Sequence, residues 1–153
     1  ILVYKTIQKK VEVLIASLQL LEEEYLSLVD ETRKKFYYEI LAQYNRKKNK
    51  FDYSCFHNDW IKRASQFIFL NRTCYNGLYR VNSKGEFNVP AGSYKNPKIC
   101  DPTNLLYVAK ALEKTTILQG DFSLCEQYVT NKTFLYFDPP YRPISKTSSF
   151  NSY

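Results

Sequence analysis

Four consecutive residues near the end of the sequence combine groups that could hold a planar base: Asp138, Pro139, Pro140 and Tyr141. Asp138 supplies a carboxylate, and the two prolines remove two N–H donors and stiffen the backbone, so the carbonyl between them is a fixed acceptor. Two acceptors beside the ring of Tyr141 suit the exocyclic amine of a base that stacks on that ring. The alternative is an acidic loop in which Pro-Pro only stops the chain.

These residues directly follow the apolar segment 133–137, which is typical of a buried strand. In open α/β sheets, ligands bind beyond the carboxyl ends of the strands, which is where Asp138 would lie. The preceding segments alternate between helix and strand, which predicts a parallel sheet covered by helices. They are, in chain order, a helix over 104–114 capped by Thr103, a strand over 115–119 and a helix or turn over 123–129.

The first half of the sequence favours helices. Apolar residues recur every three or four positions, at Leu14, Leu18, Leu21, Tyr25 and Leu28, and charged residues lie between them. This spacing predicts an amphipathic helix. Further helices are predicted over Asp30–Arg46 and 59–71.

Residues 75–95 contain too many Gly, Asn and Pro for a helix. Two runs typical of strands, 78–81 and 86–89, flank a turn-forming sequence that ends in Gly85, which predicts a β-hairpin with this glycine at a positive φ. Lys84 and Lys95 are candidates for phosphate contacts. Residues 61–120 hold nine basic and three acidic residues in a chain of net charge +7, which indicates a polyanionic partner.

Several classes of protein are disfavoured. No apolar run reaches the roughly 18 residues that span a bilayer, and no signal peptide opens the chain, so a cytoplasmic protein without a membrane partner is predicted. The single histidine, His57, is interpreted as a packing or surface residue. Free thiols, rather than metal ligands or disulfides, are predicted for the four scattered cysteines Cys55, Cys74, Cys100 and Cys125.

Asp-Pro-Pro-Tyr at a strand end resembles the catalytic motif of amino-group DNA methyltransferases. The stretch Phe-Leu-Asn-Arg-Thr-Cys-Tyr-Asn-Gly-Leu-Tyr-Arg-Val-Asn at 69–82, followed by Gly-Glu-Phe-Asn-Val-Pro at 85–90, looks like the DNA adenine methylase (Dam) family. In these N6-adenine enzymes of the α motif order, a DNA-recognition insert precedes an Asp-Phe cofactor motif and then Asp-Pro-Pro-Tyr. The resemblance covers about residues 60–153, and residues 1–59 fit as a helical stretch of suitable length.

The resemblance implies that region 75–95 contacts double-stranded DNA, at a GATC-like site. Arg80 matches an arginine that recognises a guanine, whose O6 and N7 atoms can accept two bonds from one guanidinium. Tyr75 and Asn76 match residues that enter the duplex beside the flipped adenine. Leu78 and Pro90 match apolar base contacts.

The resemblance also implies S-adenosylmethionine as cofactor, held by Asp121, Phe122 and Asp138. Asp121 could accept from the cofactor's adenine amine while Phe122 stacks on its ring; the alternative for Asp121 is an N-cap of the next helix. The implied reaction is direct methyl transfer to adenine N6, with Asp138–Tyr141 as the catalytic set. Hydrogen bonds donated by the amine to Asp138 and to the Pro139 carbonyl would localise the amine lone pair as positive charge develops.

The sequence also departs from the family. It contains no Gly-rich loop for the methionine end of the cofactor and no acidic residue for its ribose, and Ala91 stands where an aromatic residue often follows Val-Pro. The chain opens on Ile1 and contains no methionine. We therefore expect an internal fragment of a longer enzyme that is inactive alone.

The predicted fold class is α/β: part of a Rossmann-like methyltransferase sheet plus a mainly helical DNA-recognition domain carrying a β-hairpin. Residues 1–99 are assigned to the recognition region, with the hairpin at about 75–95, and residues 100–153 to a partial methyltransferase domain. The parent is interpreted as the methylase of a restriction–modification pair or an orphan enzyme. Two other functions stay open: an inactive DNA-binding remnant, which would not bind cofactor, and a methyltransferase of RNA or protein, against which the hairpin with Arg80 argues.

Overall fold

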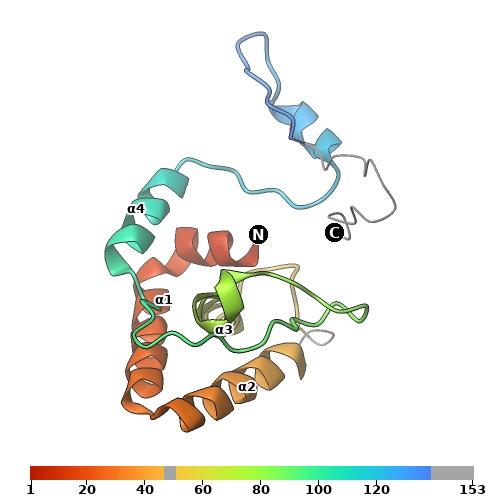
Figure 1. Cartoon of the computed structure of the whole chain (residues 1–153). Helices are drawn as coiled ribbons and strands as arrows, with labels where there is room; N and C mark the ends of the chain where they lie inside the picture. The colour runs from red at the N-terminus through yellow and green to blue at the C-terminus, as the bar shows by residue number, and fades with distance from the viewer. Residues whose placement is uncertain (47–50, 139–153) are drawn as a thin grey trace. The chain divides into compact units, whose positions relative to one another are not determined.

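The computed structural model describes residues 1–46 and 51–138. Contacts divide the chain into two units, Ile1–Gln119 and Gly120–Tyr153, and each is described by itself. The first unit is built from helices (Figure 1). They are α1 (Leu2–Ser27), α2 (Asp30–Arg46), α3 (Asp59–Thr73), the 3-10 helix η2 (Tyr75–Gly77) and α4 (Pro102–Leu112).

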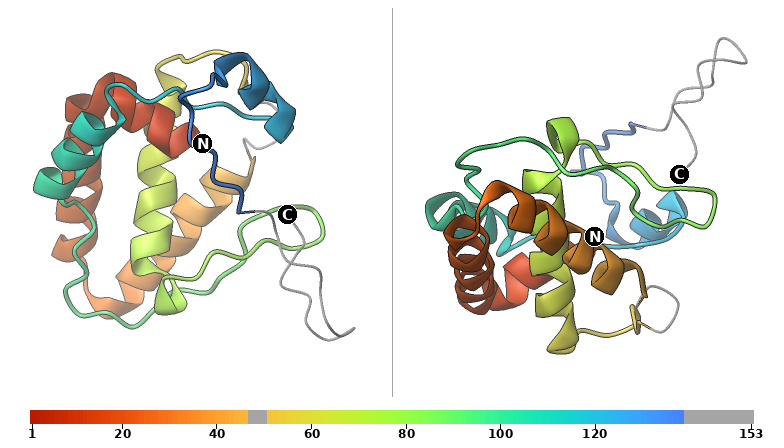
Figure 2. Two further views of the ribbon diagram at one scale, coloured as in Figure 1. Left: turned by 90° about the horizontal axis from the view of Figure 1, so that it is seen from above. Right: turned by 60° about the horizontal axis from the view of Figure 1, so that its bottom comes forward.

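Helix α3 is the centre of this unit. It packs against α1 on one side and α2 on the other, while α4 packs on α1 (Figure 2). Phe69 of α3 is fully buried, and its ring centroid lies 5.4 Å from that of Tyr25, 5.7 Å from that of Phe36 and 6.5 Å from that of Tyr37. Three helices therefore share one aromatic core.

The helices predicted from apolar spacing are confirmed. Helix α2 runs from Asp30 to Arg46 as predicted, and the acidic side chains of Asp30 and Glu31 in its first turn complement the helix dipole. Helix α1 bends at Lys10, whose φ of −149° and ψ of 47° are not helical. The buried side chains of α1 are Thr6, Ile7, Leu14, Leu18 and Tyr25.

Helix α4 begins two residues before the predicted start. The predicted cap, Thr103, is wrong: the cap is Asp101, whose Oδ1 accepts a hydrogen bond of 3.1 Å from the Asn104 N–H. Pro102 then occupies the first turn, where its missing N–H costs nothing and its fixed φ suits the helix.

The predicted Rossmann-like sheet is absent from the described residues, where the only β pairing consists of two isolated bridges. The segments 115–119 and 133–137, predicted as strands, pair with no other segment in this part of the chain. Phe134 and Tyr136 are 88% and 80% exposed, so the prediction of a buried strand is wrong. A strand is stabilised by backbone partners at its edges, and neither segment has one here.

The predicted β-hairpin is also wrong as a pair of strands. Residues 78–90, called the 78–90 loop below, turn back on themselves, and Gly85 has the predicted positive φ, 69°. Only one bridge joins the two limbs, between Val81 and Phe87. Asn82 gives the reason, because its Oδ1 accepts from the Glu86 N–H at 3.0 Å, so a side chain replaces a backbone acceptor of a regular ladder.

In the second unit, the 3-10 helix η3 (Phe122–Tyr128) confirms the helix or turn predicted after Asp121. The rings of Phe122 and Phe137 meet edge to face, with centroids 5.9 Å apart. No helix in either described stretch is both long enough and apolar enough to cross a membrane.

Candidate functional site

The seven residues predicted to contact DNA are all exposed, and all follow the end of α3. The Tyr75 N–H donates to the Pro90 carbonyl oxygen at 2.9 Å, and the Gly92 N–H donates to the Thr73 carbonyl oxygen at 2.8 Å. These bonds close the base of the 78–90 loop. They bring Tyr75 and Pro90, which are 15 positions apart in the sequence, to the same place.

Asn76 lies in a left-handed backbone conformation, with a φ of 53°, and Gly77 follows with a φ of 61°. Such a conformation is uncommon outside glycine, although asparagine tolerates it better than most residues. The Asn71 Nδ2 donates to the Gly77 carbonyl oxygen at 2.8 Å and so ties the turn to α3. Asn76 also lines a hollow of ≈ 450 Å³ together with Arg72, whose positive charge favours an anionic ligand beside it.

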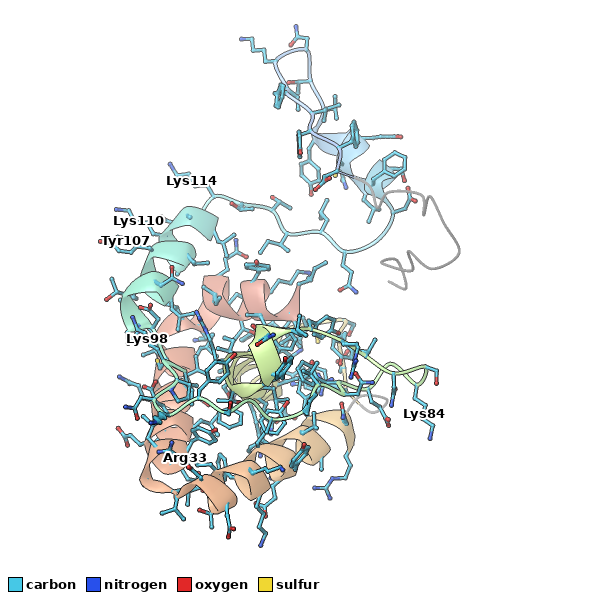
Figure 3. The ribbon with its side chains drawn as sticks, in the orientation of Figure 1. Arg33, Lys84, Lys98, Tyr107, Lys110 and Lys114 are labelled. Carbon is cyan, nitrogen blue, oxygen red and sulfur yellow. The ribbon has the colours of Figure 1, made fainter. Side chains whose placement is uncertain are left out.

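Arg80 is held by Asn88 on the opposite limb of the loop. Its Nε donates to Asn88 Oδ1 at 3.0 Å, and its Nη2 donates to the Asn88 carbonyl oxygen at 3.3 Å. Lys84 lies at the far end of the loop and points away from the helices (Figure 3). The guanidinium is therefore oriented on an exposed loop, where a groove of DNA could reach it.

Helix α2 supplies three side chains that hold the backbone of this region and that sequence reasoning missed. Arg33 Nη1 donates to the Lys95 carbonyl oxygen at 2.7 Å. Tyr37 Oη donates to the Val89 carbonyl oxygen at 2.8 Å, and Asn45 bonds both backbone groups of Phe87. The only sequence signal is that Arg33, Tyr37 and Asn45 recur at multiples of four, and therefore near one helix face.

The pKa of Tyr37 lies well above its ordinary value, mainly because burial disfavours the phenolate. Its hydroxyl therefore remains a neutral donor at any pH at which the protein is handled. The bond to the Val89 carbonyl is correspondingly insensitive to pH.

In the second unit, Asp121 caps η3, because its Oδ1 accepts from the Ser123 N–H at 3.0 Å. Hydrogen bonds from Ser123 hold the pKa of Asp121 below its ordinary value, so the carboxylate is ionised at neutral pH. The alternative interpretation of Asp121 as a helix cap is thus confirmed, and its role toward a cofactor stays a prediction.

Phe122 is 71% exposed, and its ring contacts that of Phe137, the residue that precedes the exposed Asp138. One member of the predicted cofactor set therefore contacts the residue next to the predicted catalytic set within this unit. The other three members of the predicted catalytic set, Pro139, Pro140 and Tyr141, lie outside the described residues.

The remaining candidates for chemistry have structural surroundings. His57 Nε2 lies 3.1 Å from the Asp52 carbonyl oxygen, and its ring packs near Trp60, as predicted for a packing residue. All four cysteines are free, Cys74 and Cys100 being buried. Among residues 1–46 and 51–138, no three His, Cys, Asp or Glu side chains group as metal ligands would. A groove of ≈ 820 Å³ between α1, α2 and α3 contains none of the predicted site residues.

Comparison with known proteins decides the family. The model of the D12 class N6 adenine-specific DNA methyltransferases matches residues 1–153. The chain belongs to this family. The resemblance of its motifs to the Dam-type enzymes is thereby confirmed.

Three relatives illustrate the relationship. The type II methyltransferase M.MjaIII of Methanocaldococcus jannaschii is 55% identical over 152 residues, which is 99% of this chain and 50% of that protein. The DNA adenine methylases of Vibrio cholerae and Escherichia coli K12 are 33% and 35% identical over 81% and 76% of this chain. The chain spans about half the length of M.MjaIII, and 41% and 38% of the two methylases.

Proposed function

We propose that this chain is part of a DNA adenine methyltransferase that transfers a methyl group from S-adenosylmethionine to adenine N6 in double-stranded DNA, at a GATC-like site. The match of the D12 family to residues 1–153 carries the proposal. The similarity to M.MjaIII, which is named a type II methyltransferase, supports a place in a restriction–modification pair. A DNA substrate also agrees with the cytoplasmic location predicted from the sequence.

The surface after α3 supports the DNA half of the proposal. It presents exposed apolar groups, including the half-exposed Leu78 and Tyr75, beside the cations Arg80 and Lys95. Cations bind phosphate and guanine, and apolar or aromatic groups contact base edges or replace an extruded base. In this proposal Tyr75 and Asn76 enter the duplex and Arg80 recognises a guanine, while Leu78 and Pro90 contact bases.

The second unit supports the chemical half. Methyltransferases of this family generally use S-adenosylmethionine, and an ionised Asp121 beside the exposed ring of Phe122 fits the amine and the flat face of its adenine. When bound, this cofactor supplies the methyl group. Asp138 accepts a hydrogen bond from the target N6 amine, and the Pro139 carbonyl takes the second, so the nitrogen lone pair is free to attack.

A methyl-transfer assay tests the proposal. The full-length protein is incubated with methyl-labelled S-adenosylmethionine and a duplex that contains one GATC site, and label at adenine N6 is the expected product. A duplex that already carries N6-methyladenine on both strands of that site is the matched control and should take up no label. Label on RNA or protein but not on the duplex would contradict the proposal.

Arg80→Ala is expected to cost about 1–3 kcal/mol in binding to the recognised site and to relax discrimination at one guanine. The reason is that two donors of one guanidinium pair with guanine and with no other base in the same way. Binding is compared between the cognate duplex and duplexes in which each guanine is replaced in turn. Equal loss on cognate and random duplexes would contradict the assignment of Arg80.

Lys95→Ala is expected to weaken binding to all duplexes alike and to lower the slope of log K against log salt by about 1, because a phosphate contact carries no sequence information. Lys84→Ala should behave in the same way. A salt titration on cognate and random duplexes measures both effects. A change confined to the cognate duplex would assign these lysines to base contacts instead.

A further inference from the structure

Helix α2 holds the returning limb of the 78–90 loop, residues 86–90, by its main chain. Asn45 Nδ2 donates to the Phe87 carbonyl oxygen at 2.9 Å, and Asn45 Oδ1 accepts from the Phe87 N–H at 3.0 Å. The Tyr37 hydroxyl donates to the carbonyl oxygen of Val89, two residues after Phe87 in the loop, at 2.8 Å. One carboxamide thus pairs with both backbone groups of a residue, as a neighbouring strand would.

These bonds determine which side chains of the limb face outward. Phe87 and Val89 are each 2% exposed, whereas Asn88 and Pro90 are exposed. Side chains alternate along an extended segment, so a slip of one residue would bury the outward pair and expose the inward pair. By pairing with both groups of Phe87, Asn45 excludes that slip.

The register of this limb also determines where the Arg80 guanidinium lies, because Asn88 holds it. Asn88 accepts from the Arg80 Nε through its side chain and from the Arg80 Nη2 through its backbone carbonyl. The Asn88 N–H in turn donates to the Arg80 carbonyl oxygen at 3.1 Å. Hydrogen bonds at both ends of the segment 87–89, linked by its covalent backbone, therefore join α2 to the guanidinium.

We propose that Tyr37 and Asn45 are positioning residues for sequence recognition, which act on Arg80 through the backbone of residues 87–89 without touching DNA. The proposal rests on the proposed function, because it assigns these residues to the specificity of that same site. A bidentate contact needs both donors aimed at one base edge, so a small error in register weakens the cognate contact more than it weakens binding to phosphate.

The first test removes one hydroxyl. Tyr37→Phe keeps the buried ring but leaves the Val89 carbonyl without this donor, and Tyr38→Phe is the same change on the next residue, whose side chain is exposed. In the full-length protein, the ratio of kcat/KM on the cognate duplex to that on a duplex with one guanine replaced should fall about tenfold in Tyr37→Phe, through KM. Tyr38→Phe should leave the ratio unchanged.

The second test removes the carboxamide. Asn45→Ala should lower the same ratio at least as much, because it frees both backbone groups of Phe87. Gln43→Ala is its matched control, since Gln43 accepts a bond from Gln66 of α3 and makes no bond to the loop. A fall as large in Gln43→Ala would overturn the proposal, because it would show that any loosening of α2 suffices.

A double-mutant cycle separates positioning from a general loss of stability. If Tyr37 acts through Arg80, then Tyr37→Phe should change the ratio little once Arg80 is already Ala, whereas independent effects would multiply. Multiplying effects would overturn the proposal. A wild-type enzyme that methylates no duplex would overturn the proposed function. An active wild type, with a Tyr37→Phe variant that discriminates just as strongly, would overturn the positioning role alone.

Discussion

Asp138→Ala should nearly abolish methylation by the full-length protein while leaving DNA binding nearly intact. In the proposed mechanism this carboxylate localises the lone pair of the target amine as positive charge develops on nitrogen. Removing one such electrostatic partner typically costs about a hundredfold to a thousandfold in turnover. Asp138 is exposed and belongs to a different unit from the seven DNA-contact residues, so the fold and the DNA surface do not depend on it.

Single-turnover methylation with excess enzyme measures the chemical step, and gel-shift titration of the same duplex measures binding. Phe134→Ala is a suitable control, because Phe134 is 88% exposed and carries no group that can bond the amine. Full turnover in Asp138→Ala would end the catalytic assignment. Loss of DNA binding to the same extent as turnover would assign Asp138 to the DNA surface instead.

The helices of this chain were predictable because the signals for them are local. Apolar residues at helical spacing placed α2 at its observed bounds, and the two acidic residues in its first turn agree with that start. The start of α4 was missed because Asp101 and Thr103 are both good caps, and the choice between them depends on Pro102, which fits the first turn better than the cap.

The strands were not predictable in the same way. An apolar segment such as 133–137 becomes a strand when another segment offers backbone partners, and the described residues offer none to it. In the 78–90 loop the sequence pattern correctly predicted the turn at Gly85. The regular ladder of backbone hydrogen bonds that a hairpin needs does not form, because the Asn82 side chain takes the place of a backbone acceptor.

In the candidate site too, local features were easier to predict than contacts between segments far apart in the sequence. Tyr75, Asn76 and Arg80, which meet DNA in the proposal, were predicted from the resemblance of one short stretch, 69–82, to the Dam family. Asn45 gave no such signal, because the residue it holds, Phe87, is 42 positions away. A polar side chain in a helix gives no local sign of a partner at that separation. Residues that position a site are therefore harder to find from sequence than residues that contact a ligand.

Phe69→Ala is expected to destabilise the protein by about 3–5 kcal/mol, because it removes a large side chain from a core that can collapse only in part. Phe69 is fully buried and contacts rings from both α1 and α2. Against a total stability of about 5–15 kcal/mol this is a large fraction. Urea denaturation followed by far-UV circular dichroism measures the change.

Leu20→Ala is the control for that experiment, since Leu20 is 67% exposed on α1 and its truncation should change stability by about 0.5 kcal/mol or less. An unchanged urea midpoint in Phe69→Ala would contradict the aromatic core described here.

The same variant also tests whether the core supports the residues proposed to contact DNA. Because the Phe69 ring lies against Tyr37, whose hydroxyl holds Val89, its loss should lower stability and sequence discrimination together. Arg80→Ala should lower discrimination alone, since Arg80 is exposed and lies outside the core.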